Sequence, residues 1–175
     1  MDFDTDFFTL FNLPPQFAID NAALNKQYRQ LQKQYHPDRY ANASEQEQRL
    51  ALQYAAFINE GLDILRSPVK RAIYLLGLAD IEFKNDNLAG DPEFLFQQIQ
   101  WREDLAELTS KPDPTVNLEK FINEVQVQQI TYENRVEAAM NTQDYNSVLP
   151  LISKMQFVAK LLAEAEKIED ELLVS

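Results

Sequence analysis

Residues 34–40 read QYHPDRY and contain the only histidine in a chain of 175 residues. Pro37 disfavours helical backbone angles at His36 and brings no amide donor, so a helix that reaches this segment must end at or just before the histidine. His36 and Asp38 are therefore expected at a corner of the chain. Three interpretations of this corner are open, namely a catalytic pair, a simple helix stop, or a surface that another protein recognises.

The segment before the corner, residues 21–35, has the period of an amphipathic helix that begins after a capping Asp20. Three basic residues, Lys26, Arg29 and Lys33, cluster on one side of it. The apolar residues fall on nearly the opposite side and are Leu24, Tyr28, Leu31 and Tyr35. One face is thus predicted to be core and the other a basic stripe.

The segment after the corner opens with Ser44-Glu45-Gln46-Glu47, a capping-box pattern that predicts the start of a second long helix. Two long helices joined by a short exposed loop form an antiparallel pair. The residues expected to be buried on this second helix are Leu50, Tyr54, Phe57, Ile58, Leu62 and Leu65.

Short helices are predicted on either side of this pair. An apolar helix near Phe7 to Leu13 should be stopped by the two prolines that follow. Another should begin at Ser67-Pro68, a capping serine with a proline in the first turn, and run to Leu78.

The composition narrows the class of protein. Apolar residues make up 45% of the chain, glycines number only three, and no alternating strand pattern is evident, so we expect an all-α fold. A formal charge of −12 disfavours nucleic-acid binding. The absence of cysteine and the single histidine exclude the usual zinc and iron–sulfur ligand sets, so neither a metal nor another cofactor is expected. No apolar run approaches a membrane span, and the acidic N-terminus is unlike a signal peptide, which favours a cytoplasmic location away from the membrane.

Charge is distributed unevenly along the chain. Residues 1–77 carry eight basic and nine acidic side chains, whereas residues 78–175 carry eight and nineteen. The stretch around 80–91 lacks a clean helical period and contains Asn, Asp and Gly, so a linker between two helical units is predicted there and placed at 78–90. The second unit, 91–175, is expected to form a three-helix bundle. Its helices are predicted near 91–109, 116–140 and 145–173, with Pro150 in or near the first turns of the last.

Catalysis by His36 is disfavoured by the sequence. A triad-like pair needs the carboxylate to approach the imidazole and a nucleophile to lie beyond it, and no nucleophile is suggested nearby. On spacing alone, a lone His-Pro is most often a helix stop. A rigid turn that presents an imidazole and a carboxylate beside a basic stripe also suits recognition of an acidic protein surface.

In this helical context the HPD motif resembles the J-domain, the module that stimulates ATP hydrolysis by DnaK-type heat-shock chaperones. The resemblance implies that the histidine, proline and aspartate contact the ATPase domain and linker of the chaperone. The basic face of the preceding helix would meet an acidic surface there. By position, the chaperone-binding residues would be His36, Pro37, Asp38, Lys26, Arg29, Lys33 and Arg39.

Four stretches, DFFTLFNLP, QYHPDRY, LRSPVKRAIYLL and FLFQQIQWREDLAEL, resemble the HscB type, the J-domain co-chaperones of iron–sulfur cluster biogenesis. The resemblance extends over nearly the whole chain. It implies an L-shaped, all-α protein with an N-terminal J-domain at 1–77, a linker at 78–90 and a C-terminal three-helix bundle at 91–175 that binds an IscU-type cluster scaffold. Some eukaryotic members add a cysteine-rich zinc motif, so the lack of cysteine favours a bacterial-type member.

The helix predicted at 91–109 is apolar on more than one face. Its core stripe comprises Phe94, Trp101, Leu105 and Leu108, and Leu95, Phe96 and Ile99 fall well off that stripe. The extra face could pack on the J-domain or the linker, or it could be a partner site, since a charge-rimmed apolar patch is typical of one. The resemblance implies that the scaffold-binding residues are Leu95, Phe96, Ile99, Gln100, Arg102, Glu103, Glu107 and Phe157.

We therefore expect a co-chaperone, with no catalysis of its own, that delivers an IscU-type scaffold to a DnaK/HscA-type chaperone and stimulates the ATPase of that chaperone. An alternative is a J-domain protein with a different client, whose bundle serves oligomerisation or general client holding. An unrelated helical enzyme is a third possibility, although the sequence suggests no substrate pocket.

Overall fold

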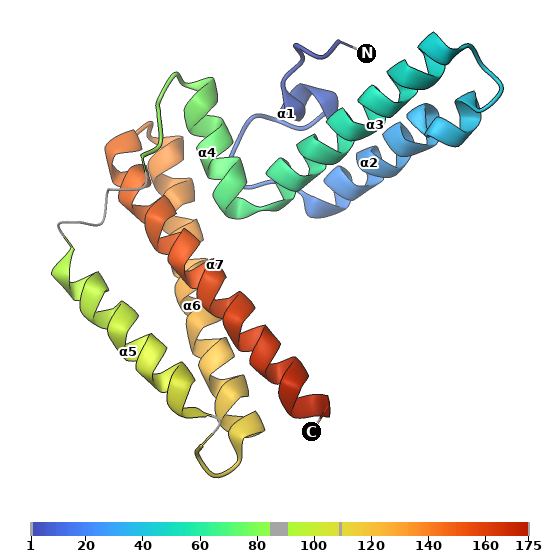
Figure 1. The fold of residues 1–175 in the computed structure, drawn as a ribbon. Coiled ribbons are helices and arrows are strands. Elements are labelled where there is room, and N and C mark those ends of the chain that lie inside the picture. The colour runs from blue at the N-terminus through green and yellow to red at the C-terminus, as the bar shows by residue number, and fades with distance from the viewer. Residues whose placement is uncertain (1, 85–90, 109, 175) are drawn as a thin grey trace. The chain divides into compact units, whose positions relative to one another are not determined.

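The computed structural model describes residues 2–84, 91–108 and 110–174. These residues are all-helical, with no strand among them, and they divide into two compact units, Met1–Ile81 and Glu82–Ser175. The predicted fold class, an all-α chain with two helical units in sequence, is confirmed (Figure 1). None of the described helices is long and apolar enough to cross a membrane.

The N-terminal unit is built around an antiparallel pair of helices, α2 and α3, which lie side by side in Figure 1. A short 3-10 turn, η1, lies between them, and the shorter helices α1 and α4 flank the pair. The bounds of these elements are Phe7–Leu10 for α1, Asn21–Tyr35 for α2, Pro37–Tyr40 for η1, Glu45–Arg66 for α3 and Pro68–Leu78 for α4.

Side-chain caps fix the starts of these helices where the sequence predicts them. The Asp20 carboxylate accepts hydrogen bonds from the first turn of α2. Ser44 and Glu47 form the reciprocal capping box at the start of α3. Ser67 caps α4, and Pro68 occupies its first turn.

Two predictions for this unit are wrong. Helix α1 ends at Leu10 rather than Leu13, because Asn12 adopts a left-handed backbone conformation with φ of 51° that cannot continue a right-handed helix. Leu50, predicted to be buried, is 38% exposed, because the buried side of α3 passes through its neighbour Ala51, which is 2% exposed, and Leu50 lies about 100° round the helix from it.

Aromatic side chains from α1 form the centre of the first core. The buried residues of this cluster are Phe7, Phe8, Phe11, Leu24, Ile58 and Leu65. Gly61 allows α1 to approach α3 closely, since a Cβ atom there would lie 2.6 Å from the ring of Phe7 and 2.8 Å from that of Phe11.

The C-terminal unit contains three helices, α5 (Pro92–Leu108), α6 (Pro114–Asn141) and α7 (Tyr145–Val174). Figure 1 shows α6 and α7 as a long antiparallel hairpin with α5 alongside, running in the same direction as α7. Pro150 lies inside α7 and does not end it. All four predicted core residues of α5 are buried, and they are Phe94, Trp101, Leu105 and Leu108.

Candidate interaction sites

The HPD corner is a turn fixed by local hydrogen bonds. Helix α2 ends at Tyr35, and His36 is extended, with φ of −61° and ψ of 129°, as the following proline requires. The backbone N–H of Asp38 donates to Nδ1 of His36 at 3.3 Å. A neutral imidazole in this arrangement carries its proton on Nε2, so Nε2 remains available as a donor.

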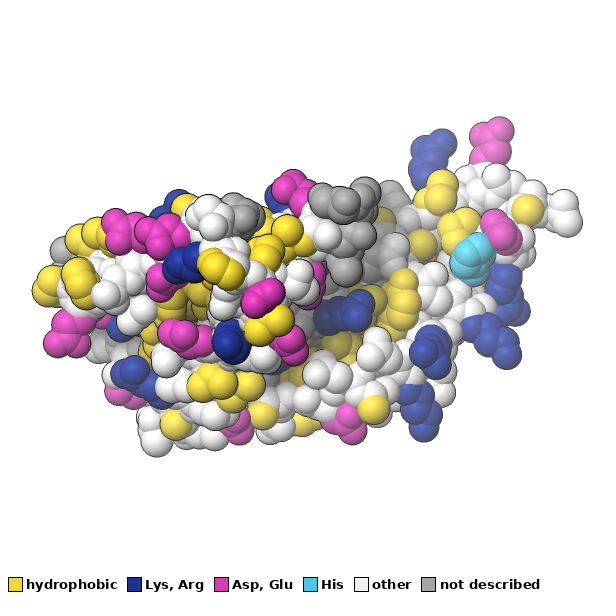
Figure 2. Space-filling view, turned by 90° about the horizontal axis from the view of Figure 1, so that it is seen from below, with side chains coloured by type: hydrophobic (Ala, Val, Ile, Leu, Met, Phe, Trp, Pro, Cys, Tyr) yellow, Lys and Arg dark blue, Asp and Glu magenta, His cyan; other side chains and the backbone are white. Residues whose placement is uncertain are grey.

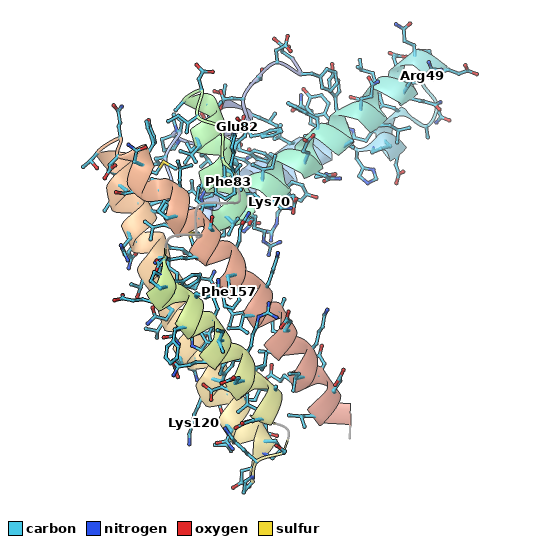
Figure 3. The ribbon with its side chains drawn as sticks, turned by 60° about the vertical axis from the view of Figure 1, so that its left-hand side comes forward. Arg49, Lys70, Glu82, Phe83, Lys120 and Phe157 are labelled. Carbon is cyan, nitrogen blue, oxygen red and sulfur yellow. The ribbon has the colours of Figure 1, made fainter. Side chains whose placement is uncertain are left out.

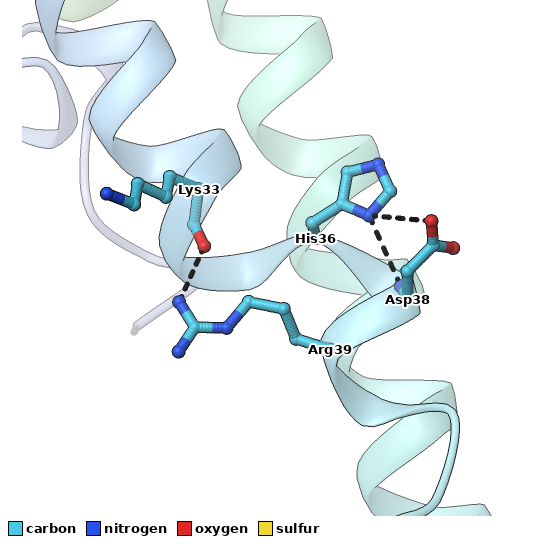
Figure 4. A network of polar contacts seen from close by, with 4 residues as sticks. All are labelled: Lys33, His36, Asp38 and Arg39. Carbon is cyan, nitrogen blue, oxygen red and sulfur yellow. Dashed lines mark hydrogen bonds and ion pairs between the residues drawn. The ribbon is translucent and has the colours of Figure 1, made fainter.

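The imidazole and the carboxylate of the corner are both accessible. The Asp38 Oδ2 atom lies 3.5 Å from His36 Nδ1, and the two side chains are 50% exposed for His36 and 89% exposed for Asp38. Figure 4 shows both groups projecting from the turn. Both polar contacts of His36 are with Asp38, so within the described chain no nucleophile completes a triad. The arrangement suits recognition rather than covalent chemistry.

Two side chains of the turn fasten it back onto α2. The Arg39 guanidinium donates to the Lys33 carbonyl at 2.7 Å (Figure 4). The Tyr40 hydroxyl donates to the Gln34 carbonyl at 3.4 Å. These carbonyls belong to the last turn of α2, where no intrahelical partner remains. Arg39 therefore holds the corner in position in addition to carrying an exposed positive charge.

The predicted basic stripe lies on the exposed side of α2. Lys26, Arg29 and Lys33 are all exposed, whereas Leu24 on the other side of the helix is buried. Figure 2 shows several Lys and Arg side chains on the same face as the histidine. The structure thus brings the seven residues predicted for chaperone binding onto one helix and the turn that follows it.

The patch predicted on α5 is exposed in its apolar part. Leu95 is 56% exposed, Phe96 62% and Ile99 48%. Their charged and polar neighbours are exposed too, and they are Gln100, Arg102, Glu103 and Glu107. Glu107 forms an ion pair with Lys111 one turn further on, at 3.3 Å. We call the three apolar residues and these four neighbours the α5 patch.

Phe157, predicted to join the α5 patch from the last helix, is half-buried beside it. Its ring stacks on Trp101 with 6.2 Å between centroids and meets Phe94 edge-on at 5.7 Å. The Arg102 guanidinium lies over the same ring, 5.5 Å from its centroid. Figure 3 shows Phe157 between α5 and α7. Arg102 and Phe157 are thus brought together, and Phe157 connects the α5 patch to the core.

Sequence reasoning missed the contact that holds the start of α5 onto α7. Lys154 of α7 lies 2.6 Å from the Asp91 carboxylate, and its ammonium is also 5.0 Å from the centroid of the Phe94 ring. The hydrogen bond from Lys154, together with one from the Phe94 backbone, lowers the pKa of Asp91 below its ordinary value. No periodicity within one helix points to a pair separated by more than sixty residues.

The described residues include no group of three or more His, Asp or Glu side chains placed to hold a metal ion. Neither candidate site is an enclosed cavity, because the HPD corner and the apolar part of the α5 patch both face outward. Both are exposed surfaces that another protein can reach.

Comparison with known proteins adds to this geometry. A family model described as the DnaJ domain matches residues 6–74, and one described as the HSCB C-terminal oligomerisation domain matches residues 90–166. The chain is 38% identical over 169 residues to the co-chaperone protein HscB homolog of Vibrio cholerae serotype O1 (strain M66-2), covering 96% of this chain and 99% of that protein. The homolog from Aeromonas hydrophila is 39% identical over 171 residues, covering 97% of this chain and 99% of that one.

Two solved structures have a fold similar to that of this chain. Chaperone HscB from Vibrio cholerae has a TM-score of 0.88 at 38% identity and covers 96% of this chain and 99% of its own. The human co-chaperone protein HscB also has a TM-score of 0.88, covering 97% of this chain and 84% of its own. The sequence identity to the human protein is 24%, so this comparison supports a shared fold only.

Proposed function

Because this chain belongs to the HscB family of J-domain co-chaperones, we propose that it binds an IscU-type iron–sulfur scaffold and delivers it to a DnaK/HscA-type chaperone. In this proposal the J-domain stimulates the ATPase of the chaperone, and hydrolysis locks the chaperone on the scaffold. The proposed division is a J-domain at 1–77, a linker at 78–90 and a scaffold-binding bundle at 91–175.

The observation that carries the chaperone half of the proposal is the exposed HPD corner beside a basic helix face. The corner is held by its own backbone and by Arg39, so a partner would meet a preformed donor and carboxylate at little entropic cost. Lys26 and Arg29 would attract an acidic surface on the chaperone and orient the encounter.

The scaffold half of the proposal is supported by the α5 patch. Leu95, Phe96 and Ile99 are large apolar side chains that no helix of their own unit covers, and charged residues rim them. Such a surface combines an apolar centre with a polar rim, which is the usual composition of a protein interface. Gln100 is neutral, so it would contribute a hydrogen bond rather than a charge.

We further propose that the chain catalyses no reaction of its own and acts in the cytoplasm alongside these partners. Its contribution would be a coupling free energy between client binding and the ATPase state of the chaperone. This fits a corner in which the imidazole has a carboxylate but no nucleophile within the described residues.

The chaperone half is tested with an ATPase assay of a DnaK/HscA-type chaperone. His36→Gln should abolish stimulation without changing the melting temperature, because the side chain is half-exposed and outside the core. Glu60→Gln, at an exposed position on α3, serves as the control and should stimulate normally. Equal stimulation by wild type and His36→Gln would overturn the docking assignment.

The scaffold half is tested by calorimetry with an IscU-type scaffold. Replacing Leu95 and Phe96 together by serine should weaken binding by roughly a hundredfold, since both side chains would be buried in the complex. Val127 and Ile130 on α6 are 60% and 57% exposed, so the same double replacement there is a matched control and should leave binding unchanged. His36→Gln should also bind the scaffold normally.

A second candidate function is a bundle that oligomerises or holds other clients. The description of the matching family model as an oligomerisation domain favours it. Sedimentation of the same variants separates the two candidates. Altered self-association with unchanged scaffold affinity would support the second, and lost scaffold affinity in an unchanged oligomeric state would support the first.

A further inference from the structure

The α5 patch continues into a groove between α5 and α7, and Arg102 is the only residue lining it that the resemblance assigns. A hollow of 390 Å³ is lined by Arg102, Leu105 and Ala106 from α5 and by Glu164, Lys167 and Ile168 from α7. Its wall is mostly apolar, and its charged residues stand at the exposed rim. The hollow belongs entirely to the C-terminal unit.

On α5, the groove follows directly from the residues of the patch. Leu95, Ile99, Arg102 and Ala106 are spaced i, i+4, i+7 and i+11, which places them on one ridge of the helix. Ala106 therefore extends the line of exposed apolar side chains by one further turn. Its small methyl group leaves room where a larger side chain would fill the groove.

On α7, the same spacing recurs. Phe157, Leu161, Glu164 and Ile168 are also separated by i, i+4, i+7 and i+11. Helices α5 and α7 run in the same direction (Figure 1). Ala106, which follows Arg102 on α5, and Ile168, which follows Phe157 on α7, line the same hollow. The first and last residues of each row are eleven positions apart, or about 16 Å at 1.5 Å per residue.

Arg102 joins the two parts of this surface. Arg102 belongs to the α5 patch, and its guanidinium lies over the ring of Phe157 at 5.5 Å. The same side chain also lines the hollow, together with Ile168. A protein that covers Leu95 and Ile99 and contacts Arg102 could therefore also contact the hollow within one continuous interface.

We propose that the groove between Ala106 and Ile168 is part of the scaffold-binding surface and receives a large apolar side chain of the IscU-type scaffold. This inference rests on the proposed function. It is favoured over a separate ligand because the hollow is open, apolar at its base and continuous with the α5 patch through Arg102. Lys167 and Glu164 at the rim would then pair with polar groups that surround the inserted side chain.

Calorimetry with the scaffold tests whether the groove contributes to the binding affinity. Ala106→Phe fills the groove and should weaken binding at least about tenfold, and Ile168→Ala removes one wall and should weaken it by a similar factor. Ala163→Phe, at an exposed position of α7 that does not line the hollow, is the matched control and should bind as wild type does. Thermal melts of all three variants identify any loss of folding.

A footprint tests the contact directly and does not depend on the stability of the filled variant. The chain contains no cysteine, so a single Cys can be introduced by Ile168→Cys, or by Ala163→Cys as the control. Saturating scaffold should slow alkylation at position 168 at least about tenfold, as expected for a side chain buried in an interface, and should leave position 163 unchanged. Mass spectrometry of this chain alone gives the readout.

The outcomes are distinguishable. Normal affinity of both groove variants, or equal alkylation of position 168 with and without scaffold, would overturn the groove assignment while the proposed function stands. Changed self-association without loss of scaffold affinity would assign the groove to a second copy and also overturn it. If the wild-type chain binds no IscU-type scaffold, the proposed function fails and this inference fails with it.

Discussion

Lys154 of α7 lies 2.6 Å from the carboxylate of Asp91, the residue that precedes α5. The same carboxylate accepts a hydrogen bond of 2.9 Å from the Phe94 backbone N–H, so it also caps the helix. The Lys154 ammonium lies over the rings of Phe94 and Tyr132, at 5.0 and 5.9 Å. One partly buried ion pair therefore orients the start of the helix that carries the α5 patch.

The first prediction concerns the pH dependence of this contact. The hydrogen bond from Lys154 lowers the pKa of Asp91, so the ionised carboxylate stabilises the folded state above the unfolded pKa and this stability is lost as pH falls through the folded pKa. Asp91→Asn should lower the free energy of unfolding by roughly 1–2 kcal/mol at pH 7. The difference from wild type should shrink below about pH 4.

Trp101 makes the measurement specific, because it is the only tryptophan and lies in the C-terminal unit. Urea unfolding followed by its fluorescence at pH 7 and pH 3 gives the two differences. Glu93→Gln, in the same first turn but exposed, is the control and should change stability by less than about 0.5 kcal/mol. Equal losses for Asp91→Asn at both pH values would contradict the prediction.

The second prediction concerns Gly61, where α1 meets α3. Alanine is a better helix former by about 1 kcal/mol, yet its Cβ would lie 2.6 Å from Phe7 and 2.8 Å from Phe11. Because both rings are buried and cannot move freely, Gly61→Ala should destabilise the N-terminal unit by roughly 1–3 kcal/mol. Thermal unfolding by circular dichroism measures the change.

Gly77 is the matched control for this substitution. It also lies in a helix, α4, but a Cβ there would meet nothing within 4 Å. Gly77→Ala should therefore be neutral or stabilising by up to about 1 kcal/mol. A stabilising effect at both glycines would show that α1 adapts to the added methyl group.

Local signals predicted most of the fold. Asp20, Ser44 and Ser67 cap the helices that they were expected to cap, because the hydrogen bonds involved span only two or three residues. The position of Leu95 off the buried stripe of α5 was also predictable from helical periodicity, although the sequence left open whether that second face is packed or exposed. The HPD motif predicted a corner because the geometry of proline acts on its immediate neighbour.

Contacts between distant segments were not predictable in this way. The pairing of Asp91 with Lys154 and the stacking of Phe157 on Trp101 depend on how helices pack, which a single-helix period does not contain. Leu50 fits a helical period, but the packed structure buries its neighbour Ala51 instead, and the sequence alone does not decide between the two. The groove at Ala106 likewise exists only because two helices present matching ridges.

The third prediction concerns ionic strength. Lys26 and Arg29 are exposed on α2, so their attraction to an acidic chaperone surface is screened over about 8 Å at physiological salt. ATPase stimulation by the wild-type chain should weaken as the salt concentration rises. The double variant Lys26→Gln with Arg29→Gln should stimulate less at low salt, and its stimulation should depend less on salt, because the long-range electrostatic attraction has been removed. Lys120→Gln with Lys160→Gln removes the same charge from the C-terminal unit and should follow the wild-type curve. Parallel curves for the two double variants would show that net charge, rather than the α2 stripe, governs the encounter.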